Sequence, residues 1–152
     1  PTEVEVLAQV HARLARHWNL SGVPMCGAAG GLAAALHATL GAPLVSGARF
    51  ILDRTNLGSR MIDLDWVVTG EGRSDDQTPL GKAPWEVMET ARTLGKRSIL
   101  ISGAIDESAR TGLLGHPSLI DSEPSGRAPS PQEALRRATI RVFERNLLGI
   151  RR

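Results

Sequence analysis

The amino-acid sequence predicts an α/β protein whose second part forms a parallel sheet. Continuous apolar runs at 66–68 and 98–102 are typical of strands buried on both faces. Helical patterns follow at about 84–94 and from Pro131, so strands and helices alternate. A polar, glycine-rich loop joins the first run to the first of these helices, which is where α/β proteins place ligands. We therefore expect a Rossmann-like, three-layer parallel sheet portion over about 64–152, preceded by a partial segment of a second α/β domain.

The composition is that of a globular protein. The chain has 152 residues, of which 41% are hydrophobic and 22% charged, enough to bury a core. The net charge is only +2 and aromatic residues make up 3%, so a nucleic-acid partner is not expected. The single cysteine, Cys26, fits a reducing compartment. Because neither a signal peptide nor a membrane-spanning apolar run is visible, we expect a cytoplasmic protein without a membrane partner.

Two helices are expected in the first forty residues. Apolar residues at intervals of three and four predict an amphipathic helix over 2–18. Thr2 is its expected N-cap, and Glu5 completes a capping box. A helix of small residues is expected at about 32–40, ended by Gly41.

The next segment leads into the sheet. The apolar run at 44–52 predicts a strand, and 53–63 predicts a short helix or turn. These residues do not continue the strand–helix alternation of the second part. We assign 1–60 to the C-terminal segment of a second, inserted α/β domain and 61–152 to the C-terminal half of the Rossmann-like domain.

The second part continues the alternation after its second strand. Its further elements are a short helix, a weak third strand, a Pro/Ser-rich loop and a final helix, expected at 106–114, 118–121, 122–131 and 131–148.

Gly27, Gly30 and Gly31 precede the helix expected at 32–40. Exposed amides at such a helix start can hold an anion. The surrounding alanines fit close helix packing equally well, and the motif lacks the ending of a P-loop and the spacing of a dinucleotide fingerprint. On these residues alone, packing is the favoured interpretation and anion binding is the alternative.

The polar loop alternates charged residues. If the chain stays extended after the strand, Glu71, Arg73 and Asp75 point to one side, because the strand period is two. Two carboxylates flanking a guanidinium can orient a small hydroxy acid, bind Mg²⁺ or supply a general base.

Flanking residues of the loop extend this chemistry. Gly70 and Gly72 let backbone amides approach a ligand closely, and Lys82 can neutralise phosphate charge at the start of the next helix. A surface loop tied by its own Arg–Asp ion pairs accounts for the same residues, and both interpretations stay open here.

Several segments together resemble a known family. GAAGGL at 27–32, VVTGEGRSDDQT at 67–78 and GKAP at 81–84 resemble the bacterial glycerate kinases. SILISGA at 98–104 and the PQEAL start of the last helix, from Pro131, fit the closing part of that family in order and spacing. The resemblance covers essentially the whole chain.

The resemblance implies two α/β domains with the site in the cleft between them. Enzymes of this family transfer the γ-phosphoryl group of ATP to a hydroxyl of D-glycerate and use Mg²⁺, a reaction that depends on positioning and charge stabilisation. The catalytic residues that the resemblance implies are Glu71, Arg73, Asp75 and Lys82. The substrate- and nucleotide-binding residues that it implies are Gly27, Gly30, Gly31, Gly70, Gly72, Gln77 and Thr78. Asp75 is also the candidate metal ligand.

The chain departs from the family in length. Family members carry an upstream half with a further glycine-rich motif, and this chain starts at Pro1 without a methionine. We expect a fragment whose full activity needs the N-terminal part. The expected macromolecular partners are that N-terminal part or a second copy of the chain in a homodimer. The alternatives are a non-catalytic α/β remnant that binds a small anion or self-associates, and a different small-molecule enzyme that reuses the cleft.

Overall fold

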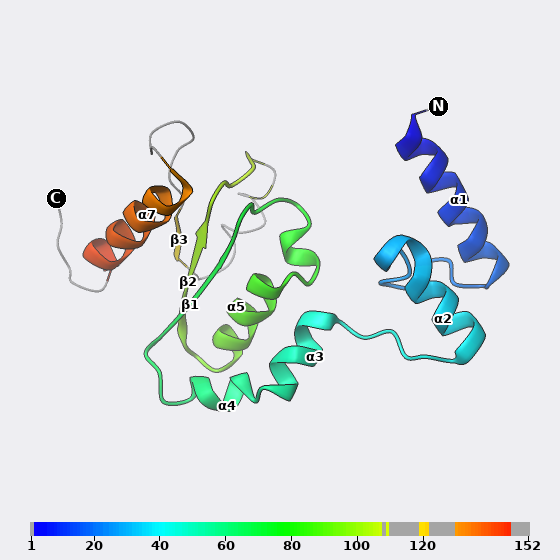
Figure 1. Ribbon diagram of the computed structural model, residues 1–152. Helices are drawn as coiled ribbons and strands as arrows, with labels where there is room; N and C mark the ends of the chain where they lie inside the picture. Colours follow the sequence, from blue (N-terminus) through cyan, green and yellow to red (C-terminus); the bar gives the residue numbers. More distant parts are fainter. Residues whose placement is uncertain (1, 108, 110–118, 122–129, 147–152) are drawn as a thin grey trace. The chain divides into compact units, whose positions relative to one another are not determined.

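The computed structural model describes residues 2–107, 109, 119–121 and 130–146 of the chain. They belong to two compact units, Pro1–Gly47 and Ala48–Arg152 (Figure 1). The domain boundary near residue 60 concerns the domains of a longer protein and stays a prediction.

The first unit is helical throughout its described elements. These are α1 (Glu3–His17), η1 (Ala28–Gly31) and α2 (Leu32–Leu40). The predicted capping box is confirmed at the start of α1: Thr2 Oγ1 accepts from the Glu5 N–H at 3.3 Å, and Glu5 Oε2 accepts from the Thr2 N–H at 2.7 Å. As expected, α2 ends at Gly41, which adopts a left-handed conformation with φ of 66°.

The core of the first unit is small and leaves α1 uncovered. Its buried residues are Leu20, Cys26 and Ala34. No residue of α1 is buried, and on its apolar face Val4 and Leu7 are 75% and 68% exposed. The amphipathic pattern of α1 is therefore real, but its apolar stripe contributes little to this core.

The expected strand at 44–52 is wrong, because most of this segment belongs to helix α3 (Gly47–Arg54). A short apolar run cannot be assigned to strand or helix from periodicity alone. Helix contacts one turn apart are present: the Arg54 guanidinium lies 5.2 Å from the centre of the Phe50 ring, and Thr55 Oγ1 donates to the Ile51 carbonyl at 2.9 Å. The short helix expected next is confirmed as α4 (Leu57–Met61).

A parallel three-stranded sheet organises the second unit, as predicted. Its strands are β1 (Trp66–Glu71), β2 (Arg97–Ser102) and β3 (Leu119–Asp121), in the order β1-β2-β3. The helices that follow β1 and β3 are α5 (Ala83–Thr93) and α7 (Pro131–Asn146), which flank the sheet in Figure 1. Glu71 is in register with Ser102, so β1 and β2 end side by side.

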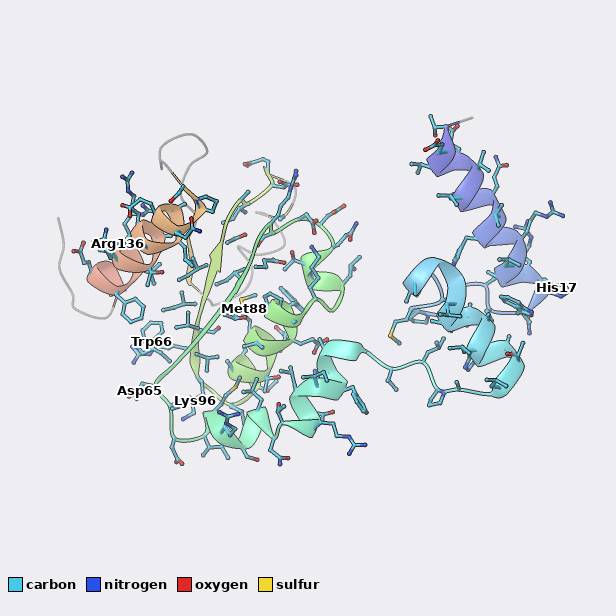
Figure 2. All side chains as sticks on the ribbon, in the orientation of Figure 1. His17, Asp65, Trp66, Met88, Lys96 and Arg136 are labelled. Carbon is cyan, nitrogen blue, oxygen red and sulfur yellow. The ribbon has the colours of Figure 1, made fainter. Side chains whose placement is uncertain are left out.

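Successive residues of β2 point to opposite faces of the sheet and pack against different helices. Leu100, on one face, packs with Met88 of α5, and both are 0% exposed; Figure 2 shows Met88 between α5 and the sheet. Ile99, on the other face, packs with Ala138 and Val142 of α7. The three-layer arrangement expected from the sequence is confirmed, because both faces of the strand are covered.

Two expectations fall largely on residues outside the described ranges. These are the short helix at 106–114 and the loop at 122–131. Among the helices that the structure describes, none combines the length and apolarity needed to cross a membrane.

Candidate functional site

The chain continues beyond β1 and β2 as two loops that are hydrogen-bonded to each other. The Gly103 N–H donates to the Glu71 carbonyl at 3.1 Å, and the Ser74 N–H donates to the Ala104 carbonyl at 2.9 Å. The Asp106 N–H then donates to the Ser74 carbonyl at 2.9 Å. These bonds fix the polar residues of both loops at the carboxyl end of the sheet, the usual ligand position of a parallel α/β protein.

Glycines permit this close approach of the two chain segments. A Cβ atom on Gly103 would lie 2.5 Å from the Gly72 carbonyl oxygen, and one on Gly70 would lie 2.8 Å from the Ile101 carbonyl oxygen. Space around Gly72 itself is open. Gly70 and Gly103 are therefore required by the pairing of the strands and loops, whereas Gly72 leaves room for a ligand near its backbone.

Buried hydroxyl groups hold one oxygen of the Glu71 carboxylate. Its Oε1 accepts from Ser74 Oγ at 2.7 Å and from Thr78 Oγ1 at 2.9 Å. Ser74 Oγ also shares a hydrogen bond of 2.9 Å with Ser102 Oγ. Ser74 and Thr78 are 0% exposed, so the structure places Thr78, a predicted ligand-binding residue, beneath the site.

Asp75 and Lys82 form an ion pair beside Glu71. Lys82 Nζ donates to Asp75 Oδ1 at 2.7 Å and lies 3.9 Å from Glu71 Oε2. The hydrogen bond from Lys82 lowers the pKa of the Asp75 carboxyl below its ordinary value. The same bond raises the pKa of the Lys82 ammonium group. The exposed Gln77 contributes its backbone N–H, which donates to Asp75 Oδ1 at 3.0 Å.

This ion pair predicts a pH dependence of stability. The lowered pKa of Asp75 gives stability that is present above the unfolded-state pKa of about 3.9 and is lost as pH falls through the folded-state pKa. The raised pKa of Lys82 gives stability that is present below about pH 10.4 and is lost as pH rises through the folded-state value.

We expect Asp75→Asn to lower the urea unfolding midpoint by a constant amount between about pH 5 and about pH 9, a difference that shrinks below about pH 4. The measurement is a series of urea titrations of both proteins across this range. A difference that persists unchanged at about pH 2 would contradict the ionic origin of the contact.

Arg73 is paired with an acidic residue of the neighbouring loop. Its Nε and Nη2 atoms donate to the two carboxylate oxygens of Asp106 at distances of 2.9 to 3.1 Å. This contact raises the pKa of the Arg73 guanidinium. A single row of Glu71, Arg73 and Asp75 is expected only if the chain stays extended, and this condition is not met. β1 ends at Glu71, and Ser74 Oγ contacts Glu71 Oε1, whereas side chains three residues apart in an extended chain point to opposite sides.

Asp106, Ser74 and Ser102 belong to the site although the sequence reasoning did not select them. Asp106 follows β2 as Arg73 follows β1, and neighbouring parallel strands place their following loops together. That position is the available signal for Asp106. Nothing in the spacing of the two serines distinguishes them from ordinary core or loop residues.

An apolar groove adjoins the polar loops. It has a volume of about 940 Å³ and lies between the sheet and α7. Its apolar lining includes Val68, Ile101, Leu135 and Phe143, and its lining also includes Glu71. Charged loops beside an apolar groove are the usual composition of a small-molecule site.

The remaining predicted residues lie in the other unit. Gly27, Gly30 and Gly31 belong to Pro1–Gly47. There Ala29, Gly30 and Gly31 have φ values of 51°, 65° and 94°, a run of left-handed residues that glycine adopts at little cost. Their role in a ligand site stays a prediction.

In the described ranges, protein side chains alone do not form a metal site. They hold no group of three or more His, Cys, Asp or Glu side chains suited to a metal ion. Mg²⁺ commonly binds one or two carboxylates together with substrate phosphates, so the exposed side of the Asp75 carboxylate remains chemically compatible with that ion.

The fold and the candidate site define an α/β protein with a cluster of charged side chains at the ends of adjacent parallel strands. The glycerate kinase family model matches residues 2–139. The chain therefore belongs to the glycerate kinase family.

The chain is also similar to individual proteins of known name. The chain is 42% identical over 88 residues to the glycerate kinase of Halalkalibacterium halodurans, covering 58% of this chain and 23% of that protein. It is 42% identical over 93 residues to the glycerate 2-kinase of Escherichia coli, covering 61% of this chain and 24% of that protein. A crystal structure of an inferred glycerate kinase 2 from Salmonella typhimurium LT2 aligns with 93% of this chain and 37% of its own, with 30% identity and a TM-score of 0.45. The chain thus matches about a quarter of the length of these curated relatives.

Proposed function

We propose that this chain supplies the phosphoryl-transfer loops of a glycerate kinase, which transfers the γ-phosphoryl group of ATP to D-glycerate or a similar small hydroxy acid. The observation that carries the proposal is the clustering of Glu71, Asp75 and Lys82 next to the loop of Arg73 at adjacent strand ends. The glycerate substrate and a cytoplasmic location rest on the same family membership and form part of the proposal.

The charged residues suit the needs of phosphoryl transfer. This reaction requires mainly positioning and stabilisation of negative charge. The exposed guanidinium of Arg73 and the ammonium group of Lys82 are suited to phosphoryl oxygens or to the substrate carboxylate. Glu71 and Asp75 are suited to accept the hydroxyl proton or to hold Mg²⁺, which when bound neutralises phosphate charge.

Full activity is proposed to need an N-terminal part beyond these 152 residues. The aligned stretches cover only 23% and 24% of two curated relatives. In the proposal, residues 1–60 belong to an inserted second domain and Gly27, Gly30 and Gly31 contribute its share of the substrate and nucleotide site.

The test is an assay of ATP-dependent glycerate phosphorylation on two proteins. One is the 152-residue chain, and the other is the same chain joined to the N-terminal part of a family member. We expect turnover from the longer protein and none from the short chain. Turnover from the short chain would remove the need for the N-terminal part, and no turnover from either would contradict the kinase assignment.

A non-catalytic, self-associating remnant is the second candidate, and the uncovered face of α1 favours it. Val4 and Leu7 are largely exposed there, and such apolar faces often mark association surfaces. Sedimentation velocity at two concentrations tests this candidate: a dimer that Leu7→Glu converts to a monomer would support it, and a monomeric unsubstituted chain would contradict it.

A further inference from the structure

Two buried hydroxyl groups are directed at one carboxylate oxygen. Ser74 and Thr78 are 0% exposed, so neither side chain reaches a ligand in the loops above them. Their oxygens lie 2.7 Å and 2.9 Å from Glu71 Oε1. A hydroxyl that donates to an ionisable side chain from beneath a ligand site can control the orientation of that side chain.

The hydrogen bonds of Thr78 determine which group receives its hydroxyl proton. A hydroxyl has a single proton to donate, and a carboxylate can only accept. Thr78 Oγ1 accepts from the Asp75 N–H at 3.1 Å, so its proton is free to be given to Glu71. The same residue therefore ties the backbone at Asp75 to the side chain of Glu71.

The second carboxylate oxygen of Glu71, Oε2, remains available to the charged residues of the loop. Oε1 accepts the Thr78 proton at 2.9 Å and lies 2.7 Å from Ser74 Oγ, whose single proton is shared with Ser102 Oγ. Oε2 lies 3.9 Å from Lys82 Nζ. Rotation of the carboxylate would break both hydroxyl contacts, and the cost of leaving buried hydroxyls unpaired opposes that rotation.

We propose that Ser74 and Thr78 are positioning residues that fix the Glu71 carboxylate, so that Oε2 faces the reacting groups beside Lys82. This inference rests on the proposed kinase function and deepens it, because it assigns orientation of Glu71 to residues that do not touch the substrate. Displacement of a reacting group by about 1 Å can lower a rate by about 100-fold.

The first test removes each hydroxyl in the active form of the enzyme. We expect Thr78→Val, which keeps the side-chain shape, and Ser74→Ala to lower kcat by about 10- to 100-fold while the KM for glycerate changes less than about threefold. Thr78→Ser restores the hydroxyl and is expected to recover most of the rate. A Thr78→Val protein with unchanged kcat would overturn the proposal.

Thr93→Val is the matched control. Thr93 is exposed on α5, and its hydroxyl donates to the Thr90 carbonyl of its own helix at 2.9 Å. The substitution removes a hydroxyl of the same type away from the loops, and we expect kcat to stay within about twofold.

The second test asks whether Thr78 acts through Glu71. In a Glu71→Ala background, which removes the acceptor, Thr78→Val is expected to change the remaining kcat by less than about twofold, because residues that act as a unit are non-additive. A further loss as large as in the unsubstituted enzyme would show that Thr78 acts independently, which overturns the assignment.

A measurement of stability, which needs no enzymatic activity, tests this proposal separately from the kinase assignment. The urea midpoints of the 152-residue chain with Thr78→Val, Glu71→Ala and both are expected to be non-additive, since the two side chains are in contact. Additive midpoints would overturn the contact itself. Absence of turnover in every unsubstituted form would instead overturn the kinase function, and with it the catalytic part of this inference.

Discussion

Replacement of Arg73 by Ala is expected to lower ATP-dependent glycerate turnover by about 100- to 1000-fold, the usual cost of removing one donor that stabilises charge in a transition state. Asp106 holds the guanidinium through both carboxylate oxygens, while 67% of the Arg73 side chain stays exposed. The side chain is thus oriented and still accessible to an anionic ligand. The measurement is kcat and KM of the active form with and without the substitution.

Arg92→Ala is the control for this prediction. Arg92 forms the same type of two-pronged pair with Glu89 at 2.8 to 3.2 Å, and it lies on α5 with 48% of its side chain exposed. We expect turnover within about twofold of the unsubstituted enzyme, since an exposed ion pair contributes little to stability. Normal rates in Arg73→Ala would remove Arg73 from the chemistry.

Asp106→Asn tests the orientation of Arg73 without removing it. The substituted amide side chain would keep one oxygen acceptor and lose the charge, so we expect a smaller loss of turnover than in Arg73→Ala. A loss equal to that of Arg73→Ala would indicate that the guanidinium has no function without Asp106.

Gly103→Ala is expected to lower the free energy of unfolding by about 3 kcal/mol, the upper end of the usual cost of overpacking. The added Cβ would lie 2.5 Å from the Gly72 carbonyl oxygen, and that oxygen accepts the Ala104 N–H at 3.1 Å. Backbone atoms cannot turn aside as a flexible side chain does, so the paired loops must separate. Urea titration followed by circular dichroism measures the loss.

Gly72→Ala is the matched control from the same pair of loops. A Cβ atom there meets nothing within 4 Å, and the residue does not adopt the left-handed conformation. We expect a change in the free energy of unfolding within about 0.5 kcal/mol. Equal destabilisation by the two substitutions would contradict the close approach at Gly103.

Local signals predict most of the helices and strands. The capping box at Thr2 and Glu5 and the glycine after α2 are set by neighbouring residues, and both are confirmed. The strand prediction at 44–52 is wrong, because an apolar run of this length fits a strand or a helix and only its packing decides between them.

The charged residues of the polar loop can be selected from the sequence, but their pairing cannot. Lys82 contacts Asp75, seven residues away in the chain, whereas Arg73 contacts Asp106, which is 33 residues away. The second contact depends on the register of β1 with β2, and no local pattern encodes that register. Whether the selected residues act in catalysis stays a prediction.

The sequence by itself determined the α/β class, the family resemblance and the loop that carries the charged residues, because each depends on residue types at short, fixed spacings. Only the tertiary structure decided that Ser74 and Thr78 lie beneath Glu71 and that Arg73 turns toward Asp106. The physical reason is that β1 and β2 run parallel and end together, so their following loops share backbone hydrogen bonds that fix which side chains meet.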